Sequence, residues 1–387
     1  MSDTTVAETF NPNLPYLTTR WELPDGPAQI LRLPGVPAPG PAHTALFRAV
    51  REIRAGRVFV AGPGSAATAL WAARSGAEVG YWTYDSAEAS ALRATFAAEG
   101  KASPRIWLQP GFEGLPAGTY HSALIHLPRG RALQQEILAL AGAMVEPGGR
   151  IAFVGAKNEG VKRALKAARE HFGHAGIVAR KSGWHAGLSQ RPREGAFPVP
   201  SLTFQHHQIT VAGQATALVS CAGAFAADRL DVGAAALIEG LAGEPMAGAE
   251  VLDLGCGTGL VGLVAARRGA SVTFTDVSAR AIATTRKTLA ANDIAPADLV
   301  LGWVIEGLPN GAFDLVVTNP PFHQGHDVTL EIAQAFIRGA RRVLRPAGTL
   351  YLVANAFLPY EPWLRTHFAR VTTAFEDGRF RVWQAKA

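Results

Sequence analysis

The sequence predicts a mixed α/β fold built from two similar domains in tandem, each with a mostly parallel open sheet. An internal repeat is the first reason: residues 57–64 resemble residues 250–257 at an offset of 193, and such self-similarity marks repeated structural units. Strand-like apolar segments also alternate with helix-like segments in both halves, as a parallel sheet with crossover helices requires. Finally, 387 residues suffice for two domains of ordinary size.

The repeat continues along the chain without a gap. At the same offset, residues 72–77 fall on residues 265–270, and residues 122–129 fall on residues 315–322. Later segments match again, at a Pro-containing turn, only after a small insertion in the second copy. The two halves are therefore expected to share one order of strands and helices.

The boundary between the copies is expected in residues 182–200, where glycines and prolines recur. We place one domain at residues 1–195 and the other at residues 196–387. Alternating residues just after this boundary, such as residues 204–209, predict a hairpin that opens the second domain. The chain is predicted to end in an antiparallel hairpin that turns at residues 377–378, an Asp-Gly pair.

The elements of the second domain follow in order from the apolar periodicity. We expect strands near residues 250–254, 271–275, 299–303, 313–318 and 348–354. We expect helices near residues 259–268, 278–291 and 327–344, and a further helix that ends near Leu241. In the first domain, a helix over residues 44–53 is expected to lead into the first long strand.

The composition indicates a globular protein. Hydrophobic residues make up 48% of the chain and charged residues 18%, which is ordinary for a folded domain and unlike a disordered segment. No apolar run is long enough to span a bilayer, and the first residues lack the pattern of a secretory signal. The two cysteines, Cys221 and Cys256, suggest neither a disulfide framework nor a metal cluster. We therefore expect a cytoplasmic protein without membrane or metal.

Positive charge is concentrated in one segment. Residues 150–194 contain ten Lys or Arg against three acidic residues, so this segment carries +7 whereas the whole chain carries +6. A basic face of this kind attracts phosphate backbones. A solvated helix face that only keeps the protein soluble explains the charge equally well.

A glycine loop indicates a cofactor site in the second domain. A strand-like segment containing Asp253 runs into Gly255, Gly257 and Gly259, and a helix-like segment follows. Glycines let backbone N–H groups approach a ligand, and the helix N-terminus adds its dipole. Asp276 ends the next expected strand, where a carboxylate can accept hydrogen bonds from ribose hydroxyls. The spacing differs from the G-x-G-x-x-G of dinucleotide enzymes, although a nicotinamide enzyme remains the alternative for this segment.

A second motif, Asn-Pro-Pro-Phe at residues 319–322, follows the strand-like residues 313–318. An exocyclic amino group is a poor nucleophile because its lone pair is delocalised into the ring. The Asn319 carboxamide oxygen can accept one N–H of such a group and the Pro320 carbonyl the other, which favours a pyramidal nitrogen. Phe322 offers a face on which a flipped-out base stacks. The alternative is a simple strand-ending turn, which is less favoured at this distance behind a cofactor loop.

The first copy lacks these chemical side chains. Val60 stands at the position of Asp253, Ala66 at that of Gly259 and Thr83 at that of Asp276, and residues 126–129 replace the Asn-Pro-Pro-Phe motif. We infer that the first domain keeps the fold and has lost catalysis. The alternative is that it binds another ligand through His126 or Asp85.

Together the two motifs resemble those of known enzymes. The loop Asp-Leu-Gly-Cys-Gly-Thr-Gly at residues 253–259 resembles that of class I S-adenosylmethionine-dependent methyltransferases. The run Asn-Pro-Pro-Phe-His-Gln-Gly at residues 319–325 resembles the signature of the ribosomal RNA guanine-N2 methyltransferases, the RsmC/RlmG family. Residues 353–360 and 378–382 resemble that family's C-terminal pattern. The resemblance is strong over residues 200–387 and architectural before them.

The resemblance implies two tandem Rossmann-like class I methyltransferase domains with mostly parallel sheets and a terminal antiparallel hairpin. The first would be a degenerate copy that docks on RNA. It also implies S-adenosylmethionine as cofactor and methylation of a guanine N2 in ribosomal RNA, in the first place 16S RNA of the small subunit. By motif, Asn319, Pro320 and Phe322 would handle the base. The implied cofactor-binding residues are Asp253, Gly255, Gly257, Gly259, Asp276, Asp231 and Trp303, although a core role is equally plausible for Trp303.

Other functions remain open. An N6-adenine methyltransferase acting on nucleic acid uses the same amino-group chemistry, and 23S ribosomal RNA is an alternative substrate. A protein glutamine methyltransferase also orients a planar amide, but such enzymes typically have Tyr after Asn-Pro-Pro and lack the duplicated domain. An RNA-binding assembly factor without turnover fits the first domain alone. Because the fused copy can do what a partner subunit would, we expect a monomer.

Overall fold

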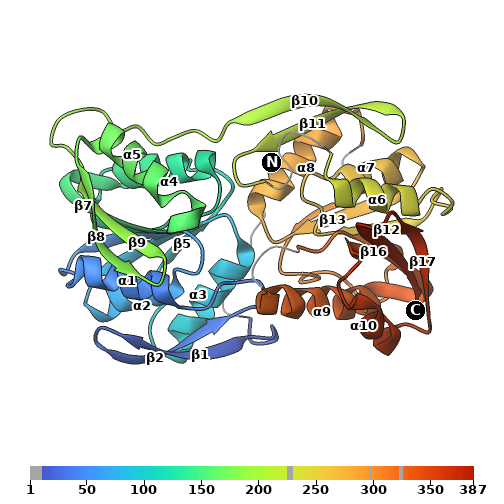
Figure 1. Cartoon of the computed structure of the whole chain (residues 1–387), viewed down its shortest axis with the longest axis horizontal. Coiled ribbons are helices and arrows are strands. Elements are labelled where there is room, and N and C mark those ends of the chain that lie inside the picture. Colours follow the sequence, from blue (N-terminus) through green and yellow to red (C-terminus); the bar gives the residue numbers. More distant parts are fainter. Residues whose placement is uncertain (1–10, 225–229, 296–297, 322–325) are drawn as a thin grey trace. The chain divides into compact units, whose positions relative to one another are not determined.

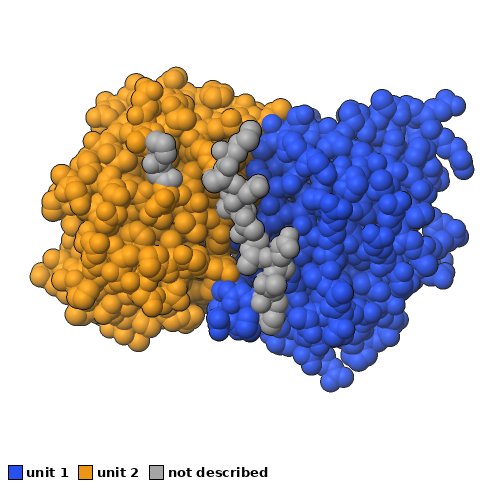
Figure 2. All heavy atoms as spheres, turned by 180° about the vertical axis from the view of Figure 1, so that it is seen from behind, with its two compact units in different colours: residues 1–202 blue, residues 203–387 orange. Residues whose placement is uncertain are grey.

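The computed structural model describes residues 11–224, 230–295, 298–321 and 326–387. The chain forms two compact units, Met1–Leu202 and Thr203–Ala387, which are coloured separately in Figure 2. The division falls after Leu202 rather than after residue 195. One reason is that Phe197 stacks on Phe172 of the first unit, with 6.0 Å between ring centroids, so the segment after residue 195 packs with the first unit.

The first unit opens with a two-stranded hairpin and then alternates strands with helices (Figure 1). Its elements are β1 (Leu17–Leu23), β2 (Gly26–Arg32), α1 (Pro41–Val50), β3 (Arg57–Ala61), α2 (Ala66–Arg74), β4 (Glu78–Thr83), α3 (Ser86–Ala98), β5 (Arg105–Leu108), β6 (Tyr120–His126), α4 (Arg131–Met144), β7 (Val145–Ala156), the short η1 (Lys157–Glu159), α5 (Val161–Phe172), β8 (Ala175–Lys181) and β9 (Trp184–Gln190). The seven-stranded sheet has the order β5-β4-β3-β6-β7-β9-β8. Only the pairs that involve β9 are antiparallel.

The second unit has the same order of elements, and its own hairpin precedes them in the sequence. Its elements are β10 (Phe204–Val211), β11 (Gln214–Cys221), α6 (Val232–Gly240), β12 (Glu250–Leu254), α7 (Leu260–Arg267), β13 (Ser271–Asp276), α8 (Ala279–Ala290), β14 (Asp298–Leu301), β15 (Phe313–Thr318), α9 (His326–Val343), β16 (Leu344–Asn355), α10 (Tyr360–His367), β17 (Arg370–Glu376) and β18 (Phe380–Lys386). The sheet order β14-β13-β12-β15-β16-β18-β17 is that of the first unit. The predicted fold class is confirmed.

The two sheets also share their strand register. Asp253 on β12 pairs with Phe274 on β13 and with Val317 on β15. In the first unit Val60 pairs with Tyr81 and Leu124. All three positions differ by the offset of 193 seen in the sequence, so the repeat reports corresponding places in two sheets. The offset rises from 193 to 199 between β15 and β16. Leu315 on β15 pairs with Thr349 on β16, and the corresponding pair in the first unit is Ser122 with Arg150. The insertion in the second copy therefore lies between these two strands.

Both predicted hairpins of the second unit are present. β10 and β11 pair over eight residues each. The last turn, between β17 and β18, is held by the Asp377 carboxylate, whose Oδ1 accepts the N–H groups of Arg379 at 2.9 Å and Phe380 at 2.7 Å. The central strand β12 is apolar and buried at Val251, Leu252 and Leu254, as expected for a strand covered by helices on both faces.

Candidate active site

The glycine loop lies at the carboxyl edge of the sheet of the second unit. β12 has β13 and β15 as its two neighbours, and all three run parallel. The residues that follow these strands therefore meet at one edge, where open α/β sheets bind their ligands. Leu254 pairs with both Thr275 and Thr318, so the glycine loop lies between Asp276 on one side and Asn319 on the other.

The loop needs glycine for two different reasons. Gly255, Gly257 and Gly259 have φ values of 76°, 58° and 78°, a region that disfavours other residues. A Cβ on Gly259 would lie 2.6 Å from the Thr285 side chain, whereas one on Gly257 would meet nothing within 4 Å. Gly257 therefore faces open space at the point where a ligand can approach the backbone.

Asp276 anchors this loop. Its Oδ2 accepts the Gly257 N–H at 2.9 Å and its Oδ1 accepts the Ser278 N–H at 2.8 Å. Burial raises the pKa of Asp276, and the hydrogen bonds from Ser278 and Gly257 oppose that shift. Each carboxylate oxygen keeps a lone pair for a further donor. The geometry thus suits a carboxylate that accepts hydrogen bonds from a pair of hydroxyl groups beside the loop.

Asp253 lies beneath the loop. The side chain is 3% exposed, and its Oδ2 accepts the Gly262 N–H at 2.8 Å, in the first turn of α7. Burial raises the pKa of Asp253 to about 7. A Cβ on Gly262 would lie 2.9 Å from this carboxylate and 2.3 Å from the Phe274 ring. Asp253 therefore joins the strand to the helix and supports the loop from within.

Cys256 is a packing residue of the loop. Burial raises the pKa of its thiol well above the ordinary value, which opposes the thiolate a nucleophile needs. Thr285 of α8 lies beside it, with 3.4 Å between Sγ and Oγ1, and the same hydroxyl donates to the Gly257 carbonyl at 3.1 Å. Thr285 was not predicted from the sequence, where it stands out only as a polar residue on the expected buried face of a helix.

Asn319 is held by a residue 88 positions earlier. Its Nδ2 donates to Asp231 Oδ2 at 2.9 Å, and the same oxygen accepts the Ala234 N–H at 3.0 Å as the N-cap of α6. A carboxylate only accepts hydrogen bonds, so Asp231 dictates that the amide nitrogen, not the oxygen, faces it. Asn319 Oδ1 is buried and has no hydrogen-bond partner among the residues that the structure describes.

A glycine allows this approach. A Cβ on Gly233 would lie 3.0 Å from Asp231 Oδ2 and 3.1 Å from both polar atoms of the Asn319 amide. A side chain at this position would crowd the hydrogen bond between Asp231 and Asn319. On the opposite side, Thr318 donates from Oγ1 to the Leu254 carbonyl at 2.7 Å, so the end of β15 is fastened to the start of the glycine loop.

The remaining predicted site residues lie nearby or beyond the described ranges. Pro320 is buried. Trp303 is 8% exposed and follows β14, and the preceding Gly302 donates its N–H to the Asp276 carbonyl at 3.0 Å. Trp303 therefore lies close to Asp276 at the end of β13. Phe322 lies outside the described residues.

In the first unit the same edge is occupied by the chain's own side chains. The N–H of Gly64, the counterpart of Gly257, donates to Glu88 Oε1 at 2.7 Å. Burial raises the pKa of this glutamate to about 8. His126 is buried and lies 2.9 Å from the Thr68 hydroxyl through Nε2, and Asp85 caps α3. The cavity left here measures about 50 Å³, room for a water or two but not for a nucleoside.

Part of the basic segment lies around His185 in the first unit. The pKa of His185 is lowered by its burial and by the charges of Arg180, Lys157 and Lys162, so these cations converge on one imidazole. Two of the ten cations serve the fold instead. Arg191 lies over the Phe197 ring, 4.9 Å from its centroid, and Arg169 donates from Nε to the Ala175 carbonyl at 2.9 Å.

Among the described residues, no helix is long and apolar enough to cross a membrane. No group of three or more His, Cys, Asp or Glu side chains is arranged to hold a metal ion within the described ranges.

Comparison with known proteins adds independent findings. Residues 215–384 match the family model "Methyltransferase small domain". The ribosomal RNA small subunit methyltransferase C of Pseudomonas paraeruginosa is 32% identical, over 79% of this chain and 88% of that protein. The protein of the same name from Hahella chejuensis is 31% identical, over 85% and 94%. The solved structure of the T. thermophilus 16S rRNA N2 G1207 methyltransferase (RsmC), in complex with AdoMet and guanosine, has a TM-score of 0.82 and 29% identity, over 96% and 98%.

Proposed function

The chain belongs to the ribosomal RNA small subunit methyltransferase C family, and from that premise we propose that it methylates the exocyclic N2 of a guanine in 16S ribosomal RNA. The methyl donor is S-adenosylmethionine. The relative of known structure was solved with AdoMet and guanosine and acts on N2 of a guanine. The two-domain plan and the sheet order described above support the transfer of this activity to the present chain.

The observation that carries the chemistry is the buried Oδ1 of Asn319, which has no hydrogen-bond partner within the described parts of the chain. Leaving a buried acceptor unpaired costs roughly 1–3 kcal/mol, and an amino N–H of guanine would relieve that cost. With its second N–H on the Pro320 carbonyl, the nitrogen turns its lone pair away from both acceptors. The lone pair is then free to attack the sulfonium methyl group in line with the breaking bond. The proton leaves after transfer, so the site needs no base beforehand.

Asp231 acts on this step through Asn319. Because its carboxylate accepts from the amide nitrogen, the amide cannot turn its N–H₂ toward the base, where it would meet another donor. We assign Asp231 this positioning role in place of, or in addition to, a contact with the methionine end of the cofactor. Phe322 retains its proposed role as a stacking face for the base.

The cofactor would lie over the glycine loop. Asp276 accepts hydrogen bonds from the ribose hydroxyls, the open backbone at Gly257 takes the ligand, and Trp303 flanks the adenine. Gly255 and Gly259 shape the loop, and Asp253 supports it from below. The transferred methyl group would come from the cofactor's sulfonium centre. Each residue named here binds or orients the cofactor or the base, or supports the loop that does so.

The first unit is proposed as an RNA-docking domain without catalysis. Glu88 lies against the loop of this unit, and the cavity of about 50 Å³ that remains at this edge is too small for a cofactor of nucleoside size. Its cluster of Lys157, Lys162 and Arg180 around His185 offers positive charge to phosphates. We further propose that the protein acts in the cytoplasm. We also propose that it is a monomer, and sedimentation of the purified chain tests this oligomeric state.

The test is methyl transfer from labelled S-adenosylmethionine to 16S RNA, 23S RNA and intact small subunits, followed by nucleoside analysis. N2-methylguanosine on 16S RNA or the subunit is the expected product, and an Asn319→Ala protein is the blank. N6-methyladenosine would replace the proposal with an adenine methyltransferase, and N2-methylguanosine on 23S RNA alone would change the substrate. Absence of transfer to every RNA, with cofactor still bound, would refute RNA methylation.

A further inference from the structure

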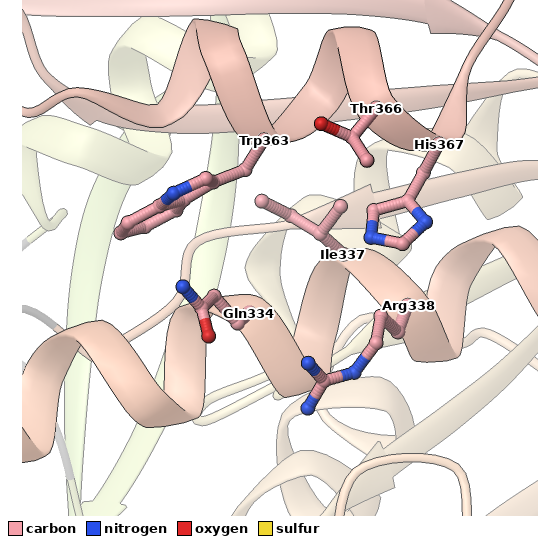
Figure 3. A pocket seen from close by; sticks show the side chains of 6 residues that line it. All are labelled: Gln334, Ile337, Arg338, Trp363, Thr366 and His367. Carbon is pink, nitrogen blue, oxygen red and sulfur yellow. The ribbon is translucent and has the colours of Figure 1, made fainter.

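A groove runs between α9 and α10 of the second unit, apart from the cofactor edge. It has a volume of about 180 Å³. Figure 3 shows side chains of α9 facing side chains of α10 across it. The lining residues are Gln334, Ile337 and Arg338 from α9 and Trp363, Thr366 and His367 from α10.

The indole of Trp363 is held in place from behind. Its ring stacks on Tyr360 with 5.4 Å between centroids and 30° between planes, and Tyr360 stacks in turn on Trp383 at 6.1 Å and 29°. Tyr360 and Trp383 are at most 1% exposed. Trp363 is therefore the half-buried end of a stack rooted in the core, and a rigid aromatic face loses little freedom when a planar ligand stacks on it.

The groove carries positive charge. Arg338 is exposed and forms no ion pair within the described residues, and His367 faces the same space. The acidic residue in the first turn of α10, Glu361, is occupied by Arg365 at 2.7 Å. An aromatic face beside a guanidinium, an imidazole, an amide and a hydroxyl matches the parts of a nucleotide, namely a planar base and a phosphate.

The groove also lies on the helix that leaves the active site. α9 begins at His326, shortly after the Asn319 loop, and Gln334 follows about 12 Å along the helix axis. Its volume is below the roughly 300–1,000 Å³ of enclosed sites for free small molecules. A single nucleotide of a longer strand needs no such enclosure, because the rest of the strand is bound elsewhere.

We propose that the α9–α10 groove binds one unpaired nucleotide of the substrate RNA, near the methylated guanine. The base stacks on Trp363 and the adjoining phosphate pairs with Arg338 and His367. This inference rests on the proposed function and deepens it, because it adds a second contact with the RNA on the catalytic unit itself.

The test compares Trp363→Ala, Trp363→Phe and Arg338→Ala proteins in binding and methylation of 16S RNA or the small subunit. We expect Trp363→Ala to weaken RNA binding roughly 5- to 100-fold, with Phe restoring most of the affinity. We expect Arg338→Ala to reduce the slope of log affinity against log salt by about 1. At saturating RNA the transfer rate stays as in the unmodified protein, so the loss appears in KM.

Arg286→Ala is the matched control, since Arg286 is an exposed arginine on another helix, α8, of the same unit. S-adenosylmethionine binding and thermal unfolding report the integrity of each variant. Wild-type affinity and salt slope in Arg338→Ala would overturn the groove. Because Arg338 is exposed, this variant decides the matter even if Trp363→Ala does not fold. A failure of the proposed function is distinguished by the unmodified protein, which would then yield no N2-methylguanosine.

Discussion

The hydrogen bond between Asp231 and Asn319 gives the sharpest test of the catalytic geometry. In an Asp231→Ala protein the Asn319 amide loses the acceptor that orients it. A hydrogen bond to a charged group contributes about 1.5–3 kcal/mol, and this energy is used to keep Oδ1 aimed at the amino group. If it is lost in the transition state, the rate constant for transfer falls about 10- to 150-fold.

The same substitution also removes the N-cap of α6. Loss of the bond from Asp231 to the Ala234 N–H costs about 1 kcal/mol of stability. Asp85→Ala in the first unit is the matched control, because Asp85 caps α3 through the N–H groups of Ala87 and Glu88. Both variants should lose similar stability, whereas only Asp231→Ala should lose the transfer rate.

An Asp231→Asn protein separates orientation from charge. One side-chain oxygen can still accept from both Ala234 and Asn319, so we expect a loss of less than about tenfold, the difference between a charged and a neutral acceptor. The assay is single-turnover methyl transfer at saturating cofactor and RNA, with cofactor affinity measured by calorimetry. A full rate in Asp231→Ala would refute the positioning argument. Weaker cofactor binding at an unchanged rate would instead support a contact with the methionine end.

Four further predictions concern the candidate active site and the basic segment of the first unit. Asn319→Ala should abolish transfer and leave cofactor affinity within about twofold, since the proposed partner of the amide is the base and not the cofactor; an equal loss of both would contradict this. Asp276→Ala should weaken cofactor binding by about 10-fold or more, because a charged acceptor is lost, as calorimetry would measure. Lys162→Glu with Arg163→Glu should weaken RNA binding and lower its salt slope by about 2 or more; an unchanged slope would remove the basic cluster from the interface. Asp253 has a pKa raised to about 7 from an ordinary 3.8, so the folded state binds its proton more tightly and stability should fall as pH rises from about 4 to 7. Asp253→Asn keeps an acceptor for Gly262 and should flatten this dependence in thermal unfolding, and an undiminished slope would place its origin elsewhere.

The sequence alone determined the features that depend on backbone geometry. Glycine is favoured where φ is positive, so the G-x-G-x-G loop predicted a tight turn at which a cofactor could approach the backbone. The offset of 193 predicted two sheets of one plan, because a conserved register needs a constant spacing between strands. Asp276 could be placed because parallel strands end at one edge, so the end of the next strand must lie beside the loop.

The tertiary structure decided which side chains face one another. The contacts of the two carboxylates depend on packing, which directs Asp253 to the Gly262 N–H beneath the loop and Asp276 to the Gly257 N–H beside it. Glu88 assumes in the first unit the backbone contact that Asp276 makes in the second, from a helix and not from a strand. No spacing rule predicts such a replacement, because it depends on how a helix lies against a loop.

The same reason explains the partner of Asn319. Asp231 is 88 residues away in the chain. The resemblance implied a cofactor-binding role for it, and no sequence pattern predicted its contact with Asn319. Local sequence sets what a residue offers, here one carboxylate oxygen at the start of α6. Only the packing of α6 against the end of β15, close enough to favour glycine at residue 233, decides that this oxygen also orients the Asn319 amide.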